Sequence, residues 1–168
     1  MTDSKINGEP VDVLLVEDNI AHAELVIRSF DDHRIANKIH HVSDGEEALN
    51  YLFRREDYAD PVKSPRPHVI FLDLRLPKVD GLEVLKEIKS TREMEKIPTV
   101  IFTTSSAELD VAKAYECHAN SYLVKPVNFE KFNQLMDDIG FYWLAWNHHP
   151  WETERSEERR VGKECRSR

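Results

Sequence analysis

Five short apolar segments recur along the chain, and an amphipathic stretch follows each of them. Residues 13–16, 69–72 and 100–102 are apolar at every position, which is typical of parallel strands covered on both faces. This pattern predicts strands over residues 11–16, 38–42, 68–72, 99–102 and 122–124. The stretches between them are the expected helices.

Helix start signals fall between the predicted strands. Ser43-Asp44-Gly45-Glu46 and Ser105-Ser106-Ala107-Glu108 both match a capping box, and Asn128 can cap a helix over residues 129–146. Alternating strands and helices with right-handed crossovers predict an α/β fold, in which a doubly wound parallel sheet carries helices on both faces. In such a sheet the ligand site lies beyond the carboxyl ends of the strands.

Two segments stand outside this repeat. Residues 57–67 contain Pro61, Pro65 and Pro67, which predict a surface loop after the second helix. Residues 152–168 mix both charges with almost no apolar content. We therefore expect a flexible N-terminus over residues 1–10 and one domain over residues 11–147. The C-terminal tail, residues 148–168, is expected to be disordered, with its last ten residues an appended, non-native segment.

Composition narrows the function classes. The chain has 168 residues, enough for one domain, and a formal net charge of −8, which disfavours nucleic acid as a partner. No apolar run reaches the roughly 18 residues needed to cross a bilayer, and the first ten residues show no signal-peptide pattern. We therefore expect a cytoplasmic protein without a membrane partner. Cys117 and Cys165 lack metal-ligand spacing, so reduced thiols are expected.

Polar residues that can carry chemistry follow four of the predicted strands. Glu17 and Asp18 end the first strand, Asp73 the third, Thr103 the fourth and Lys125 the fifth. Three carboxylates at one edge repel one another unless protons or a hard cation neutralise them, and Mg²⁺ prefers oxygen ligands. The pattern therefore predicts a magnesium site in which Asp73 can act as a nucleophile toward a phosphoryl group.

The remaining residues at this edge fit a phosphate pocket. The ammonium of Lys125 and the hydroxyl of Thr103 can each hold a phosphate oxygen. Pro77 and Gly81 shape a tight loop after Asp73. The Lys125-Pro126 bond is a candidate for a cis peptide that aims the lysine inward.

These motifs, in this order, resemble those of response regulator receiver domains over residues 11–146. The motifs are the acidic pair, Asp73 within Asp-x-x-x-Pro-x-x-x-Gly, Thr103, Tyr122 and Lys125-Pro126. The resemblance implies a flavodoxin-like fold with strand order 2-1-3-4-5. It also implies that a sensor histidine kinase phosphorylates Asp73 within a two-component phosphorelay. Beyond slow self-phosphotransfer and autodephosphorylation, a receiver is no enzyme.

The resemblance also assigns the ligands. It implies that Asp18, Asp73 and the main-chain carbonyl of Arg75 bind Mg²⁺, for which Mn²⁺ can substitute, while Glu17 reaches the ion through water. Thr103 and Lys125 would hold the phosphoryl oxygens. Thr103 and Tyr122 would form the switch that changes the protein-binding face for a downstream target.

A narrower resemblance is to stand-alone regulators associated with phytochrome-type kinases. It rests on the proline-bearing loop, on Thr103-Thr104-Ser105-Ser106 and on Phe141-Tyr142-Trp143. The aromatic surplus after residue 140 is expected to support a homodimer. His118 departs from the family, which commonly has glycine there, so we expect a left-handed backbone at this histidine.

Three other functions compete with this interpretation. Phosphohydrolases with an aspartyl nucleophile need a second aspartate two residues on, where this chain has Arg75. A phosphorylation-independent interaction module of receiver type usually lacks a site residue, but all five are present here. Nucleotide hydrolysis is disfavoured because the chain has no G-x-x-x-x-G-K-[ST] loop.

Overall fold

A computed structural model describes residues 10–32 and 37–147, so the tail over residues 148–168, most of the N-terminus and Cys165 lie outside the described residues. One parallel sheet forms the centre, in the predicted order β2-β1-β3-β4-β5. Its strands are β1 (Val11–Val16), β2 (Asn37–Val42), β3 (Val69–Leu72), β4 (Thr99–Thr103) and β5 (Ser121–Val124). Each of the five predicted strands is confirmed, with bounds that differ by at most one residue.

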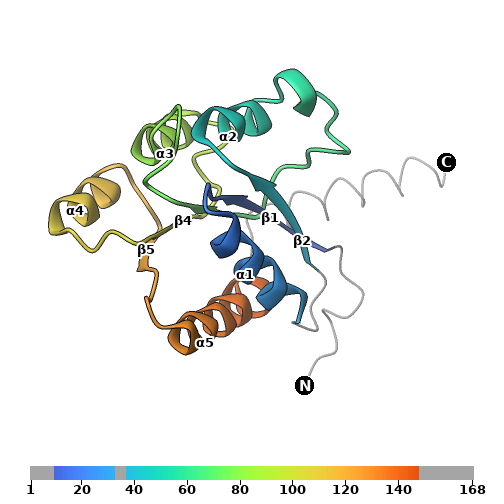
Figure 1. Ribbon diagram of the computed structural model, residues 1–168. Coiled ribbons are helices and arrows are strands. Elements are labelled where there is room, and N and C mark those ends of the chain that lie inside the picture. The colour runs from blue at the N-terminus through green and yellow to red at the C-terminus, as the bar shows by residue number, and fades with distance from the viewer. Residues whose placement is uncertain (1–9, 33–36, 148–168) are drawn as a thin grey trace.

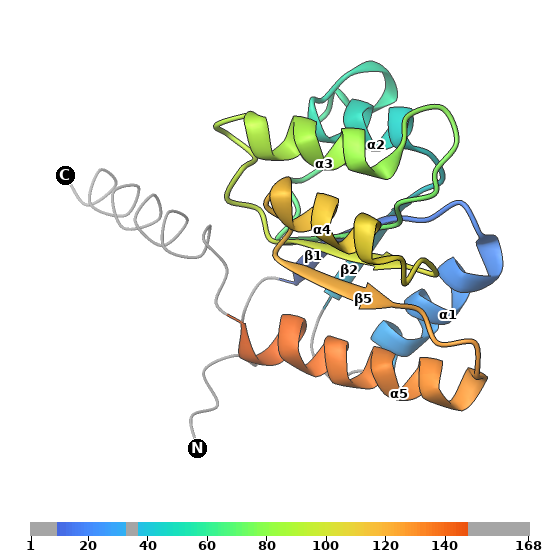
Figure 2. The same ribbon diagram turned by 90° about the vertical axis from the view of Figure 1, so that its left-hand side faces the viewer.

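Helices cover both faces of this sheet, as Figures 1 and 2 show. On one face lie α1 (Ile20–Asp31) and α5 (Phe129–Gly140), which pack against each other. The other face carries α2 (Gly45–Leu52), α3 (Gly81–Ser90) and α4 (Glu108–Glu116). Within the described residues, no helix is both long and apolar enough to span a membrane.

Two separate cores follow from the alternation of side chains along the strands. Leu14 and Ile70 face α2, α3 and α4, whereas their neighbours Val13 and Phe71 face α1 and α5. Because residues 13–16, 69–72 and 100–102 are apolar at every position and buried, both faces of the sheet are shielded from water at its centre. The carboxyl ends of these strands are consequently held in a rigid edge.

The start of α2 differs from the prediction by one residue. Asp44, rather than Ser43, is the N-cap, and its Oδ1 accepts a hydrogen bond from the Glu47 amide at 2.8 Å. In return, Glu47 Oε2 accepts one from the Ser43 amide at 3.0 Å. The next residue is Gly45, and a Cβ there would lie 2.0 Å from the Val79 carbonyl oxygen. Only a glycine fits this close approach of α2 to the β3–α3 loop.

At α4 the predicted capping box is wrong. The helix begins at Glu108, and its N-cap Ala107 makes no side-chain cap bond. The Ser105 hydroxyl instead donates to Asp110 Oδ2 at 2.5 Å, so a contact with a side chain of the first turn takes the place of the cap. Asn128 caps α5 as predicted, through a bond from the Lys131 amide, but α5 ends at Gly140 and continues as the π-helix η2 (Phe141–Trp146).

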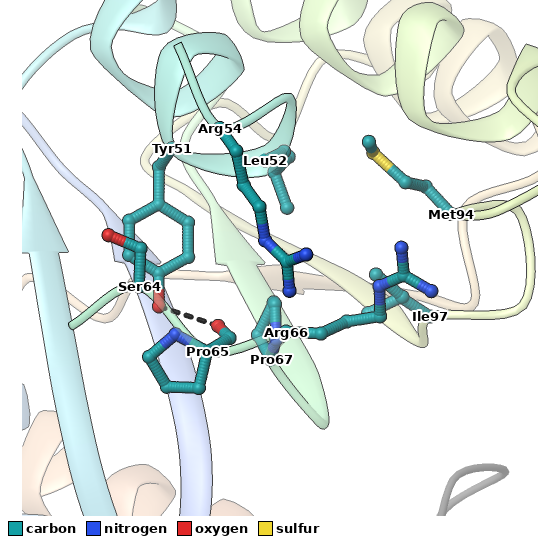
Figure 3. Close-up of a pocket in the computed structure, with 9 residues that line it drawn as sticks. All are labelled: Tyr51, Leu52, Arg54, Ser64, Pro65, Arg66, Pro67, Met94 and Ile97. Atoms are coloured by element: carbon teal, nitrogen blue, oxygen red, sulfur yellow. Dashed lines mark hydrogen bonds between the residues drawn. The ribbon is translucent and has the colours of Figure 1, made fainter. Parts of the chain in front are cut away.

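The proline-bearing segment is a loop, preceded by the single 3₁₀ turn η1 (Glu56–Tyr58). The end of this loop is hydrogen-bonded to α2, because the hydroxyl of Tyr51, a residue of α2, donates to the Pro65 carbonyl at 2.8 Å (Figure 3). The cavity beneath is about 10 Å³, room for a single water molecule at most. His118, with a φ of 67°, adopts the predicted left-handed backbone.

Candidate functional site

The predicted site residues lie at one edge of the sheet. Glu17 and Asp18 directly follow β1, Asp73 follows β3, Thr103 is the last residue of β4, and Lys125 follows β5. Because these four strands are neighbours and all parallel, their carboxyl ends meet at the same edge. The topology therefore brings together residues that are up to 108 positions apart in sequence.

Three carboxylates converge there. Oxygen atoms of Glu17, Asp18 and Asp73 lie within 4.8 Å of one another. Glu17 and Asp73 are 1% and 6% exposed, whereas Asp18 faces solvent. Since all three donors are oxygens and one is open to water, the set suits a hard divalent cation that keeps part of its hydration shell.

Main-chain bonds hold the two buried acids in place. The Asp73 amide donates to the Val16 carbonyl at 3.1 Å, which ties the end of β3 to β1. Asp73 Oδ1 accepts from the Arg75 amide at 3.2 Å, and Glu17 Oε1 accepts from the Asn19 amide at 3.0 Å. The remaining carboxylate oxygens are therefore the ones presented to the site.

Lys125 supplies a positive charge inside this cluster. Its Nζ lies 3.0 Å from Asp73 Oδ2, contacts Glu17 Oε2, and sits 5.4 Å from the centre of the Phe102 ring. The side chain is almost fully buried, so the lysine offsets part of the carboxylate repulsion at low dielectric. A divalent cation would offset the rest.

The pKa values of Glu17 and His22 are shifted from their ordinary values. Burial raises the pKa of Glu17 to about 7, although the Lys125 ammonium opposes that shift. His22, on the first turn of α1, places Nδ1 3.3 Å from Lys125 Nζ and stacks on Phe132. Burial first, and the Lys125 charge second, lower the pKa of His22 below its ordinary value. Sequence reasoning missed His22, although its position just after the acidic pair could have indicated it.

The loop after β3 is packed tightly against Asp73. The Pro77 carbonyl accepts bonds from the Val79 and Gly45 amides, at 2.8 and 3.3 Å. The Gly81 amide donates to the Leu74 carbonyl at 3.0 Å, and a Cβ on Gly81 would lie 2.1 Å from the Asp73 carbonyl oxygen. Gly81 therefore lies directly against the main chain of Asp73, and Pro77 joins the loop to the start of α2.

The β5 side of the site differs in one respect from the prediction. The described residues contain no cis peptide, so the hypothesis of a cis Lys125-Pro126 bond is wrong. The lysine instead owes its inward direction to β5, because the Lys125 amide donates to the Thr103 carbonyl at 2.7 Å. Pro126 follows this last ladder bond and ends the strand.

The predicted switch residues lie at the mouth of the site. Thr103 is fully buried, and its Oγ1 accepts a bond from the Ser105 amide at 3.5 Å. The Tyr122 hydroxyl donates to the Ser105 carbonyl at 2.9 Å, so the tyrosine already faces the β4–α4 loop. Burial raises the pKa of Tyr122, which keeps this hydroxyl protonated as a donor.

Comparisons with known proteins agree with this geometry. The sequence model of the response regulator receiver domain matches residues 13–137. The chain is 44% identical over 142 residues to the probable methanogenesis regulatory protein FilR2 of Methanothrix harundinacea, covering 84% of this chain and 89% of that protein. It is 40% identical over 138 residues to the response regulator Rcp1 of Synechocystis, covering 82% and 92%.

Solved structures give the same answer. The Mn²⁺-bound form of Rcp1 superposes with a TM-score of 0.80 at 39% identity, and the match covers 84% of this chain and 99% of that one. The phosphorylated cyanobacterial phytochrome response regulator RcpA has a TM-score of 0.80 at 37% identity, with coverage of 84% and 99%. The chain therefore belongs to the response regulator receiver domain family of two-component signalling and is similar to the phytochrome response regulators within it.

Proposed function

We propose that this chain is a single-domain response regulator that accepts a phosphoryl group on Asp73 in a reaction that needs Mg²⁺. One observation carries the proposal: Glu17, Asp18 and Asp73 share a cluster that also holds the buried ammonium of Lys125. Such a cluster is costly to bury unless a cation and then a phosphoryl group use it. The Mn²⁺-bound and phosphorylated relatives support both parts of the proposal.

Each residue has a part in the transfer. An Asp73 carboxylate oxygen attacks phosphorus, the bond from phosphorus to the donor breaks, and an acyl phosphate results. Asp18, Asp73 and the Arg75 carbonyl would hold Mg²⁺, with Glu17 reaching it through water, and the ion offsets charge on the phosphoryl oxygens. Lys125 and Thr103 donate to those oxygens. Movement of Thr103 and Tyr122 would then change the face formed by α4, β5 and α5.

The partners follow from this role. We infer a sensor histidine kinase as the phosphodonor, of phytochrome type because of the similarity to Rcp1 and RcpA, and a downstream protein as the target. We also infer a cytoplasmic protein that can form a homodimer. The exposure of Tyr142 and Trp146, 54% and 75%, supports that contact, whereas Trp143 packs into the core at 9%. The intact site disfavours a phosphorylation-independent interaction module.

The direct test is incubation with acetyl phosphate. With Mg²⁺ present, intact-mass spectrometry should show the gain of one phosphoryl group per chain, and excess chelator should abolish the gain because the carboxylates then repel the incoming anion. Peptide mapping should place the group on Asp73. Labelling that is independent of the metal, or that maps elsewhere, would contradict the proposal.

Metal affinity should depend on pH through Glu17. Its raised pKa means that the free protein holds a proton there below about pH 7, and the cation must displace that proton. Mg²⁺ affinity should therefore rise with pH and level off above 7, so that binding at pH 6 is roughly tenfold weaker than at pH 8. Calorimetric titration measures this.

Two variants control that titration. Glu17→Gln removes the group that titrates, so its Mg²⁺ affinity should change little between pH 6 and pH 8. Asp18→Ala removes a proposed ligand but keeps Glu17, so it should weaken binding at both pH values and retain the pH step. A wild-type affinity that is equal at both pH values would show that Glu17 does not compete with the metal.

A further inference from the structure

One acidic residue outside the carboxylate cluster bridges two loops at the mouth of the site. Asp110 lies on the first turn of α4, and its side chain is 14% exposed. Its Oδ2 atom accepts from the Arg75 guanidinium at 2.8 Å and from the Ser105 hydroxyl at 2.5 Å. These two donors come from the β3–α3 and β4–α4 loops, which directly follow Asp73 and Thr103.

The main chain and the side chain of Arg75 bind different acidic residues. Its amide donates to Asp73 Oδ1 at 3.2 Å, whereas its guanidinium reaches across to α4. The Arg75 side chain is 67% exposed, so the guanidinium has room to turn. An acyl phosphate on Asp73 would carry about two negative charges in place of the single charge of the carboxylate. Two anions would then compete for one guanidinium.

Contacts other than the ion pair with Arg75 hold the Asp110 side chain in place. The short bond from Ser105 anchors the carboxylate, and the Tyr122 hydroxyl in turn holds the Ser105 carbonyl at 2.9 Å. Helix α4 has only Ala114 buried, so apolar packing does little to fix its first turn. Polar contacts to Asp110 therefore set the distance between α4 and the site.

We propose that Asp110 is a positioning residue that holds the Arg75 guanidinium away from the phosphoryl group on Asp73 and so sets the lifetime of the acyl phosphate. The inference rests on the proposed function. In hydrolysis, a water oxygen bonds to phosphorus and the bond from phosphorus to Asp73 breaks. The carboxylate is restored, and both protons of the water leave with inorganic phosphate. A guanidinium resting on the phosphoryl oxygens obstructs that attack, so Asp110 keeps the lifetime short.

The test compares lifetimes in two backgrounds. Asp110→Asn should lengthen the acyl-phosphate lifetime by about threefold to tenfold, because one charge-assisted hydrogen bond must break before water attacks. In the Arg75→Ala background, Asp110→Asn should have no effect. Glu108→Gln is the matched control, since it removes an acid from the same helical turn, and its lifetime should equal that of the wild type. The measurement is the decay of the phosphorylated mass after the phosphodonor is removed.

The outcomes separate the two proposals. If the wild type is labelled but Asp110→Asn decays at the wild-type rate, or decays equally slowly with and without Arg75, the role of Asp110 is refuted and the phosphorylation site stands. If the wild type takes up no phosphoryl group, the proposed function and this inference both fall. A longer lifetime that requires Arg75 supports the inference, because a merely structural role of Asp110 would not depend on the arginine.

Discussion

The Asp73→Asn variant is expected to take up no phosphoryl group under conditions in which the wild-type chain takes up one. The amide has nearly the shape of the carboxylate, so the bond from the Arg75 amide to Oδ1 can remain. It lacks the anionic oxygen that attacks phosphorus, and it removes one donor of the metal cluster. The loss should therefore be complete rather than partial.

The fold of this variant should be intact. Asp73 is 6% exposed and lies beside Glu17, so removing its charge also removes repulsion between buried carboxylates. The Lys125 ammonium keeps Glu17 as its partner. We expect the free energy of unfolding to change by no more than about 1 kcal/mol, which urea titration checks.

Asp80→Asn is the matched control for Asp73→Asn. Asp80 caps α3 through a bond from the Leu82 amide at 2.9 Å, and asparagine caps helices about as well as aspartate. The same chemical change, seven positions away, should leave phosphorylation intact. Phosphorylation of Asp73→Asn at the wild-type level would show that another residue is the acceptor.

Gly81→Ala should strongly destabilise the protein. The added Cβ would lie 2.1 Å from the Asp73 carbonyl oxygen and 2.6 Å from Leu74 Cα. Both contacts are with backbone, so no flexible side chain can move away. We expect the free energy of unfolding to fall by about 3 kcal/mol, the upper part of the range for overpacking.

The same substitution should slow phosphorylation, because relief of the clash displaces the main chain of Asp73. Urea denaturation measures the stability, and the initial rate of labelling by acetyl phosphate measures the site. Lys86→Ala, at an exposed position of α3, should change neither quantity by a measurable amount. Wild-type stability of Gly81→Ala would mean that α3 can move away from Asp73 without cost.

The fold was largely predictable because its signals are local. Continuous apolar runs at residues 13–16, 69–72 and 100–102 mark strands buried on both faces, and the structure has β1, β3 and β4 there. The strand order came from the family resemblance rather than from periodicity, because local patterns carry no information on which strands are neighbours. The structure confirms that order.

The errors have a common cause, which is competition between a local rule and a contact outside the short motif. Ser105 matches the sequence rule for a cap, but its hydroxyl is bonded to Asp110. Ser43 matches the same rule, but Asp44 is the N-cap, and Glu47, one residue further along the helix than the motif's Glu46, completes the box. In both cases the deciding group lies further along the helix, where a short motif does not extend.

The groups at the edge of the sheet could be predicted from the order of the residues, because a residue that follows a buried parallel strand emerges at the carboxyl end of the sheet. Glu17, Asp73 and Lys125 are cases of this rule. How these groups are paired is visible only in the folded chain, where Lys125 contacts two carboxylates, His22 contacts Lys125, and the Arg75 guanidinium contacts Asp110. Such pairings depend on side-chain reach and burial across elements distant in sequence, and the order of the residues does not encode either quantity locally.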